Sequence, residues 1–270
     1  MNKVISFKAE FQDPRFLQIY LLGSFLIYGI LFLGWSSRMM VFSAALVSTL
    51  TTQFIWTRVK GGDLNSLRSA LISGLGLCLL LRVESPLIMA LVGILTISSK
   101  FILRFKGKHI FNPTNFGIII AVLSGLAWIT PGQWGRGEVT ILLIIIAAVG
   151  ILTRGGRWDV SVSFIFSLLV LEVMRSHFYL GWDLSVVLHR LTSGTILLFA
   201  FFMITDPKTT PNSRKGRILW GALIALLSFI LSGFFYLYQA PLIALFIISL
   251  TTPLVDRLYE AERFKWISKH

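Results

Sequence analysis

Apolar residues come in long, almost uninterrupted blocks along this chain instead of in amphipathic stripes. The blocks have lengths near the roughly twenty residues that an α-helix needs to cross a bilayer, although some are shorter. Polar segments that are rich in Lys and Arg separate them. The pattern predicts about ten helices, over residues 16–35, 39–57, 67–82, 86–104, 114–130, 138–153, 159–175, 184–205, 217–237 and 239–257. We therefore expect an all-α, polytopic membrane protein that forms a single integral membrane domain over residues 1–270.

Composition supports this interpretation. Apolar residues make up 55% of the chain, mean hydropathy is +0.79, and only 14% of residues are charged, whereas about 25% is typical of soluble domains. Membrane proteins concentrate tryptophan at the two membrane–water interfaces. Every tryptophan here falls at or just outside an end of a predicted helix, at positions 35, 56, 128, 134, 158, 182, 220 and 266. The sequence therefore predicts an aromatic belt.

The net charge of +13 is distributed as an orientation signal. Nineteen Lys and Arg residues fall on one side of the predicted helices, together with both ends of the chain, and four fall on the other side. Because basic residues mark the cytoplasmic side, we expect both termini to be cytoplasmic. We expect no nucleic-acid partner, since no folded basic face is available for one.

A weak internal repeat relates the third and eighth blocks. SALISGLGLCLLL resembles RLTSGTILLFAFF, and Ser73-Gly74 matches Ser193-Gly194. Five helices separate the copies, which would therefore cross the membrane in opposite senses, as in inverted-repeat transporters with a midplane site. We expect two inverted five-helix repeats, with short polar ends outside them; the alternative is that the small residues only let helices pack closely. The expected divisions are 1–15, about 16–137, about 138–258 and 259–270.

The most informative stretch is the eighth block and the turn after it. The block is apolar without a charge from Leu191 to Thr205 and then stops at Asp206-Pro207, where proline cannot continue a helix normally. We expect a membrane helix that ends in a polar, partly unwound pocket, which is tolerated at that depth only where protein or a cavity satisfies the backbone. Its candidate site residues are Ser193, Gly194, Thr205, Asp206 and Thr209.

A second polar break, residues 106–117, connects the fourth and fifth blocks. Asn112, Thr114 and Asn115 offer amide and hydroxyl groups that can hydrogen-bond the edge of a planar ring, and Lys106 and Lys108 add positive charge that would also suit a phosphate. The alternative is a helix-capping turn beside orientation-determining lysines.

Few charged or reactive residues lie inside the blocks. Glu172 and Arg175 are three apart, so we expect an ion pair on one helix face. His189 and Arg190 either precede a span that begins near residue 191 or face a protein interior; we favour the first, with 183–190 as a short interfacial or re-entrant piece. Cys78, the single cysteine, is expected to be a buried hydrophobe, and we expect no metal site.

At this level of detail the chain resembles the NqrB/RnfD family, membrane subunits of the sodium-pumping NADH:quinone reductase and of the Rnf ferredoxin:NAD reductase. The resemblance rests on SALISGLGLCLL (69–80), FNPTNFG (111–117), HRLTSGTILLFAFFMITDPKTTPNSRKGRILWGAL (189–223) and TTPLVD (251–256). It implies the ten-helix inverted repeat and a role in transmembrane electron transfer through flavin. It also makes Asn112 and Asn115 candidates for contacts to riboflavin or FMN.

One departure from the family concerns covalent flavin. Family members hold FMN on a threonine in a long segment between the fifth and sixth spans, but here that segment is only about 131–138, with no matching acceptor motif. Ser193-Gly194-Thr195 lacks the motif's alanine and lies inside a span, where a phosphoester would be costly to bury. We expect no covalently attached flavin. The chain then resembles the short, stand-alone RnfD-like proteins called UnbU.

Three functions remain open at this stage. The first is an electron-transport subunit of an inner (or thylakoid) membrane, with non-covalent flavin and partner redox subunits or a flavoprotein. The second is a transporter or channel for a flavin or another small neutral solute. The third is a membrane anchor or assembly subunit without a redox centre. Any nicotinamide chemistry would belong to another subunit, because GxGxxG does not follow any strand-like run.

Overall fold

The computed structural model describes residues 13–130, 134, 145, 148, 150 and 157–264, and all structural statements below refer to these residues. The chain forms two compact units. Unit 1 consists of residues 1–102, 113–155 and 193–195, and unit 2 consists of residues 103–112, 156–192 and 196–270. The predicted sixth helix and most of the short 131–138 loop lie outside the described residues.

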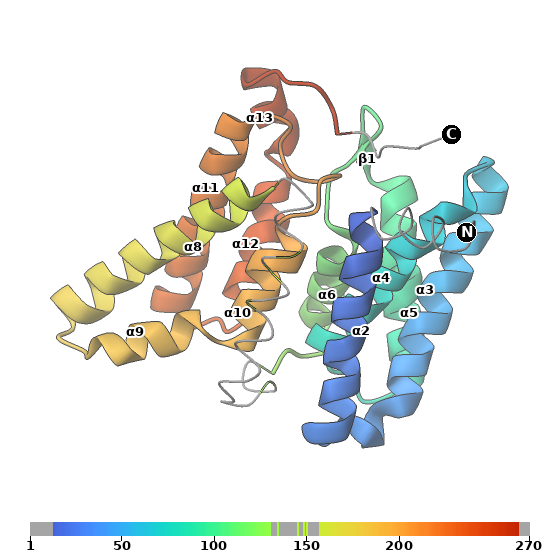
Figure 1. The fold of residues 1–270 in the computed structure, drawn as a ribbon, viewed down its shortest axis with the longest axis horizontal. Helices are drawn as coiled ribbons and strands as arrows, with labels where there is room; N and C mark the ends of the chain where they lie inside the picture. The colour runs from blue at the N-terminus through green and yellow to red at the C-terminus, as the bar shows by residue number, and fades with distance from the viewer. Residues whose placement is uncertain are drawn as a thin grey trace, which may run out of the picture. The chain divides into compact units, whose positions relative to one another are not determined.

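Unit 1 is a bundle of apolar helices (Figure 1). Helix α3 packs against α4 and α5, α2 packs against α4, and α5 packs against α6. Two short 3-10 helices, η1 and η2, lie in the connections. The elements are α2 (Pro14–Phe32), η1 (Trp35–Arg38), α3 (Met39–Lys60), η2 (Leu64–Ser66), α4 (Leu67–Leu80), α5 (Pro86–Ile102) and α6 (Pro113–Leu123).

Capping residues explain where the helices of unit 1 begin and end. Asp13 accepts a hydrogen bond from the backbone N–H of Arg15, and Pro14 occupies the first helical position, where its missing N–H costs nothing. Gly61 ends α3 at a φ of 64°, a left-handed conformation that glycine adopts without strain. Local sequence thus fixes the ends that hydropathy leaves uncertain.

Unit 2 begins with a small antiparallel hairpin and continues with helices, of which α8 packs against α11 and α11 against α12. The eighth predicted block bends by 50° between α9 and α10, and the tenth bends by 55° between α12 and α13. The elements are β1 (Arg104–Phe105), β2 (Lys108–His109), α8 (Trp158–Glu172), η4 (Val173–Tyr179), α9 (Leu184–Leu191), α10 (Gly194–Leu198), η5 (Phe199–Met203), α11 (Arg214–Phe234), α12 (Ala240–Ser249) and α13 (Thr252–Leu258). Both η4 and η5 are π-helical.

The predicted helices agree with the structure. Every predicted block outside residues 131–156 contains a helix or two or three consecutive helices. The fifth block, predicted over 114–130, is shorter than expected, because α6 ends at Leu123. The hairpin at 104–109 is the exception to the all-α expectation in the described residues. Within the part of the chain that the structure describes, four helices are long and apolar enough to cross a membrane, or up to six if each bent pair is one span. The count of ten spans, the inverted repeat and the orientation stay predictions.

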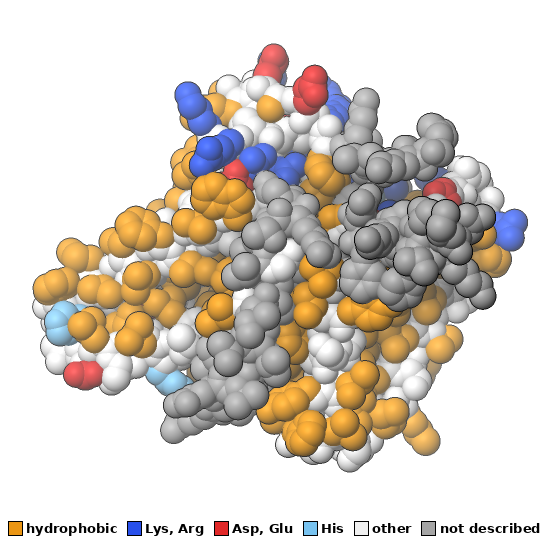
Figure 2. All heavy atoms as spheres, in the orientation of Figure 1, with side chains coloured by type: hydrophobic (Ala, Val, Ile, Leu, Met, Phe, Trp, Pro, Cys, Tyr) orange, Lys and Arg blue, Asp and Glu red, His pale blue; other side chains and the backbone are white. Residues whose placement is uncertain are grey.

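The distribution of side chains is that of a multi-pass membrane protein. Large apolar residues such as Phe166 on α8 (63% exposed) and Leu31 on α2 (68% exposed) lie on the outside, while Gln53, Thr96 and Ser161 are buried. Figure 2 shows apolar side chains along α8 and α9, and Lys and Arg side chains gathered over the ends of α11 and α13. Apolar outer surfaces on this scale would be unfavourable in water.

The aromatic-belt prediction is wrong for three tryptophans. Trp35 is 6% exposed, Trp134 1% and Trp220 0%. Gly29 makes room for the indole of Trp35, because a Cβ at this position would lie 2.2 Å from the ring, and Trp220 donates to the backbone oxygen of Ile248 (3.3 Å). These side chains are used for internal packing, which proximity to a helix end does not reveal.

Candidate functional site

The polar turn after η5 has a defined conformation in unit 2. The hydroxyl of Thr205 donates to the carbonyl of Phe201. The backbone amides of Thr209 and Thr210 both donate to the carbonyl of Asp206. The carboxylate of Asp206 accepts from the backbone amide of Lys208. Pro207 has no N–H and cannot extend the helix. The sequence therefore folds here into a side-chain-capped turn. The predicted end of the helix at Asp206-Pro207 is confirmed, and the polar pocket stays a prediction.

Asn112 joins this turn to the FNPTN segment. Its side-chain amide donates to the carbonyl of Met203 at 3.3 Å and to the carboxylate of Asp206 at 3.4 Å, and the residue is 7% exposed. Asn112 is separated from Asp206 by more than ninety residues in sequence. The structure thus brings together Asn112, Thr205, Asp206 and Thr209, four of the predicted site residues, within unit 2.

Two basic side chains hold the far part of the same turn. Lys108 donates to the carbonyl of Thr210 (2.6 Å) and forms an ion pair with Asp256 (2.7 Å). Arg157 donates to the hydroxyl of Thr210 (3.1 Å) and to the carbonyl of Pro211 (2.6 Å). Burial lowers the pKa of Arg157 to about 10, and burial also lowers the pKa of Lys108 despite the opposing effect of Asp256. Arg157 therefore stays charged at neutral pH.

A third cation completes this network. Arg217 forms a bidentate pair with the carboxylate of Asp159, with distances of 2.6–2.9 Å, and donates to the carbonyl of Asn212 (2.6 Å). Asp256 accepts from the amide of Asn212 (2.7 Å). We call the residues that hold the turn the clamp; they are Lys108, Arg157, Asp159, Arg217 and Asp256.

The distribution of charge along the sequence does not predict the clamp. It identifies Lys108, Arg157 and Arg217 as orientation signals, and an orientation signal does not require a contact with another side chain. The available signal was the acidic residue near each helix end, Asp159 in the first turn of α8 and Asp256 in α13. Carboxylates beside basic residues at helix ends indicate ion pairs as well as topology.

Thr114 and Asn115 belong to unit 1. Both are buried, at 7% and 0% exposure, in the first turn of α6. The hydroxyl of Thr114 donates to the carbonyl of Ser73 at the long distance of 3.5 Å, and Gly76 lets Thr114 approach, since a Cβ there would lie 2.9 Å from its methyl group. The hydroxyl of Thr114 is therefore directed into this unit.

The two Ser-Gly pairs serve close packing. A Cβ at Gly74 would lie 2.6 Å from the hydroxyl of Thr49, and a Cβ at Gly194 would lie 2.7 Å from the ring of Trp134. Gly194 also begins α10 just after the 50° bend. The structure supports the packing alternative for these glycines.

One expectation about charges inside the blocks needs correction. Glu172 does not pair with Arg175; it accepts hydrogen bonds from Arg190 (2.8 Å) and from Ser176 (3.3 Å), and Arg175 donates to the carbonyl of Gly233. The chain is π-helical over Val173–Tyr179, so the i,i+3 spacing of an α-helix no longer applies.

The structure agrees with the interpretation of residues 183–190 as a short piece before the span. Helix α9 is separate from the segment that begins at Gly194 and is bent from it by 50°. His189 is exposed, and Arg190 is 35% exposed and pairs with Glu172.

The side chains around Asn112 fit a flavin in their chemistry. An isoalloxazine edge presents carbonyl oxygens and an imide N–H, which require a donor and an acceptor. The Asn112 amide supplies a donor whose present bonds, at 3.3 and 3.4 Å, are longer than the usual N–H···O range. The carboxylate of Asp206 supplies an acceptor. Among the described residues, no three His, Cys, Asp or Glu side chains form a group that could hold a metal ion.

Comparison with known proteins gives a consistent family match. A model described as the NQR2, RnfD, RnfE family matches residues 130–265. The chain is 34% identical over 141 residues to a subunit of the ion-translocating oxidoreductase complex of Cronobacter sakazakii, covering 50% of this chain and 36% of that protein. It is 28% identical over 211 residues to the corresponding protein of Citrobacter koseri, covering 78% and 53%. The chain thus spans between about a third and a half of these curated relatives.

Proposed function

Because the chain belongs to the NQR2, RnfD, RnfE family, we propose that it is a membrane electron-transport subunit that holds a non-covalent flavin. The observation that carries the proposal is the contact of Asn112 with Asp206, which unites the two polar turns of unit 2. Asn112, Thr205 and Thr209 are buried, and Asp206 is partly exposed. Polar groups at the end of an apolar helix cost free energy unless they bind a ligand or are all hydrogen-bonded.

The relatives supply the assembly part of the proposal. They are named as subunits of an ion-translocating oxidoreductase complex. We extend this to the present chain as a need for partner redox subunits or a flavoprotein, since electrons must enter and leave through other proteins. The chain would then contribute one step of a longer electron path.

The proposed roles follow from the chemistry of each side chain. Asn112 would donate to a ring carbonyl of riboflavin or FMN, and Asp206 would accept from the imide N–H. Thr205 and Thr209 fix the turn that presents Asp206. A bound flavin supplies one- and two-electron transfer. The sequence also predicts contacts from Thr114, Asn115, Ser193 and Gly194, which belong to unit 1 and are not part of this cluster.

Purified protein tests the proposal directly. We would record the absorption and fluorescence spectra of the intact protein in mild detergent, before and after acid precipitation. The proposal requires flavin in the supernatant. Flavin left on the pellet would contradict the prediction that none is attached covalently. A colourless protein that also fails to bind added riboflavin would contradict the proposal, and flavin uptake by vesicles that contain only this chain would favour a transporter.

A further inference from the structure

Helix η5, directly before the Asp206 turn, has π-helical backbone hydrogen bonding. In an α-helix the amide of Ile204 would donate to the carbonyl of Ala200, four residues earlier. Here it donates to the carbonyl of Phe199, five residues earlier, at 3.0 Å. π-Helical turns inside helices occur frequently at functional sites. Ala200 is 0% exposed, so its carbonyl needs a donor from another part of the chain.

Ser161 of α8 supplies this donor. Its hydroxyl donates to the carbonyl of Ala200 at 2.5 Å, and the residue is 0% exposed. Phe164 lies three residues further along, on the same face of α8. Its ring packs edge-on against the ring of Phe199, with the centroids 5.1 Å apart. One face of α8 thus contacts η5 through an aromatic pair and through a hydrogen bond to the carbonyl from which the π-helical turn withdraws the amide.

The last carbonyl of η5 also depends on a side chain. In an α-helix the donor to Met203 would be the amide of Pro207, which has no N–H. The side chain of Asn112 (3.3 Å) and the amide of Asp206 (3.4 Å) donate to the carbonyl of Met203 instead. The register of η5 therefore decides where this carbonyl and the carboxylate of Asp206 lie relative to Asn112.

We propose that Ser161 is a positioning residue for the flavin, because it stabilises the π-helical register of η5 and so keeps Asp206 beside Asn112. The inference rests on the proposed function and adds to it a residue that acts through the backbone of Ala200. Without the hydroxyl the α-helical register is favoured, since that register gives the carbonyl of Ala200 the amide of Ile204. A shift of one residue turns every later side chain by about 100° around the helix axis, which moves Asp206 away from Asn112.

Riboflavin binding by the intact protein tests the inference. We would dialyse the protein in mild detergent, titrate it with riboflavin and measure Kd from the fluorescence. Ser161→Ala should raise Kd about ten-fold, or about 1.4 kcal/mol, in a protein that stays monodisperse in size-exclusion chromatography, because a buried acceptor loses its donor unless the register changes. The visible circular dichroism of bound riboflavin should change as well, since the groups around the ring move. Ser161→Thr keeps the hydroxyl and should keep most of the affinity.

The matched control is Ser163→Ala. Ser163 lies on the same helix and also donates its hydroxyl to a backbone carbonyl, that of Ile218 in α11, at 2.6 Å. Ile218 lies inside an α-helix, whose backbone amides donate to the carbonyls four residues earlier, so this variant should bind riboflavin as the wild type does. Equal Kd values for wild type and Ser161→Ala, or an equal loss in Ser163→Ala, would overturn the inference and leave the proposed function intact. Wild-type protein that binds no riboflavin would overturn both.

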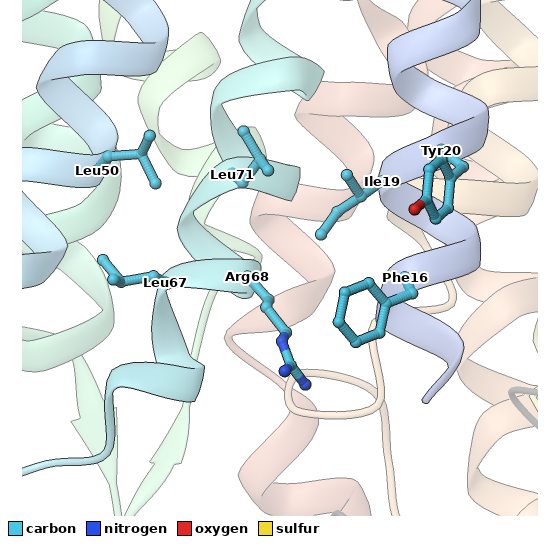
Figure 3. A pocket seen from close by; sticks show the side chains of 7 residues that line it. All are labelled: Phe16, Ile19, Tyr20, Leu50, Leu67, Arg68 and Leu71. Carbon is cyan, nitrogen blue, oxygen red and sulfur yellow. The ribbon is translucent and has the colours of Figure 1, made fainter. Parts of the chain in front are cut away.

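A second control concerns the apolar depression between α2, α3 and α4 in unit 1 (Figure 3). Its volume of about 330 Å³ is at the lower end of the range for ligand pockets, so it is the other place that could take up an aromatic ring. Leu71→Trp narrows the depression and should leave the Kd for riboflavin unchanged. A raised Kd in this variant, with no effect of Ser161→Ala, would show that riboflavin binds in unit 1 and would overturn the inference.

Discussion

Asn112 is the residue on which the flavin proposal depends most. Asn112→Leu keeps the approximate volume but removes the donor shared by Met203 and Asp206. We expect loss of bound flavin, together with a destabilisation of about 1–3 kcal/mol from the acceptors left without it. Flavin per protein would be measured after acid release, at a temperature well below unfolding.

Asn65→Leu is the control for this change. Asn65 is an exposed residue of η2 and contacts Asp63 only locally, so its replacement should leave flavin content unchanged. The sequence makes the same prediction for Asn115→Leu, at a residue of unit 1 that is 0% exposed. Wild-type flavin content in both the Asn112 and Asn115 variants would remove these residues from the proposed site.

Asp13 gives unit 1 a defined pH response. Burial alone would raise its pKa, but hydrogen bonds from Arg15 and Arg68 hold the pKa in the folded protein below 3.8, whereas an unfolded chain would show the ordinary value. The unfolded state therefore binds more protons in acid, and the contribution of Asp13 to stability is complete above pH 3.8 and is lost as the pH falls through the folded pKa. Thermal unfolding followed from pH 6 down to about pH 3 should show a shallower acid decline in Asp13→Asn than in wild type. Parallel declines would contradict this assignment.

Among the elements, the turn of residues 205–213 is held more firmly than its loop-like sequence indicates. Three cations of the clamp donate to its carbonyl and side-chain oxygens. Arg217→Gln would leave the carboxylate of Asp159, 4% exposed, without its bidentate partner. Breaking a buried pair from one side costs about 3–5 kcal/mol, so we expect a clear fall in the unfolding temperature measured in detergent.

Two further variants separate the contribution of the pair from that of charge alone. Arg214→Gln removes an exposed cation that lies one turn away and stacks over the ring of Trp158 at 5.1 Å, so it should change stability by no more than about 1 kcal/mol. Arg217→Lys should recover only part of the loss, because an ammonium cannot reproduce the two parallel bonds of a guanidinium. Equal unfolding temperatures for Arg217→Gln and Arg214→Gln would show that the clamp is not stabilising.

Hydropathy predicted the helices because each helix carries apolar side chains along its whole length, whether they pack inside the protein or lie on its outer surface. It could not predict the π-helical turns of η4 and η5, since an apolar block has the same hydropathy whichever type of helix it forms. It also missed the hairpin at 104–109, two residues per strand with no periodicity to detect. Proline placed the turn at Asp206 correctly, because its effect on the backbone is local.

The candidate site was predictable in part, because the effects that form each of its two turns are local in the sequence. Asn112 and Asp206 were each identified from their own turn, but their contact spans more than ninety residues and could only be inferred from resemblance. The ion-pair partners of Lys108 and Arg217 were not foreseen, because charge counting assigns a side of the membrane and not a neighbour.

At the scale of the whole molecule, the family match covers one of the two turns of the proposed flavin site. The matched segment, residues 130–265, contains the Asp206 turn and every clamp residue except Lys108. Asn112 lies outside that segment. Variants of Asn112 therefore test the part of the proposal that the family match does not support.

The orientation of the chain is the last prediction, and the single cysteine makes it accessible. Cys78 is fully buried, so Cys78→Ala gives a background without reactive thiols into which exposed reporters can be placed. The reporters are Lys215→Cys at the start of α11 and Ser185→Cys at the start of α9, both exposed in the structure. Because basic residues mark the cytoplasmic side, a membrane-impermeant maleimide should label Ser185→Cys in intact cells and Lys215→Cys only after the membrane is opened. The reverse pattern would show the opposite orientation. Labelling of both variants in intact cells would show that the starts of α9 and α11 do not lie on opposite sides of the membrane.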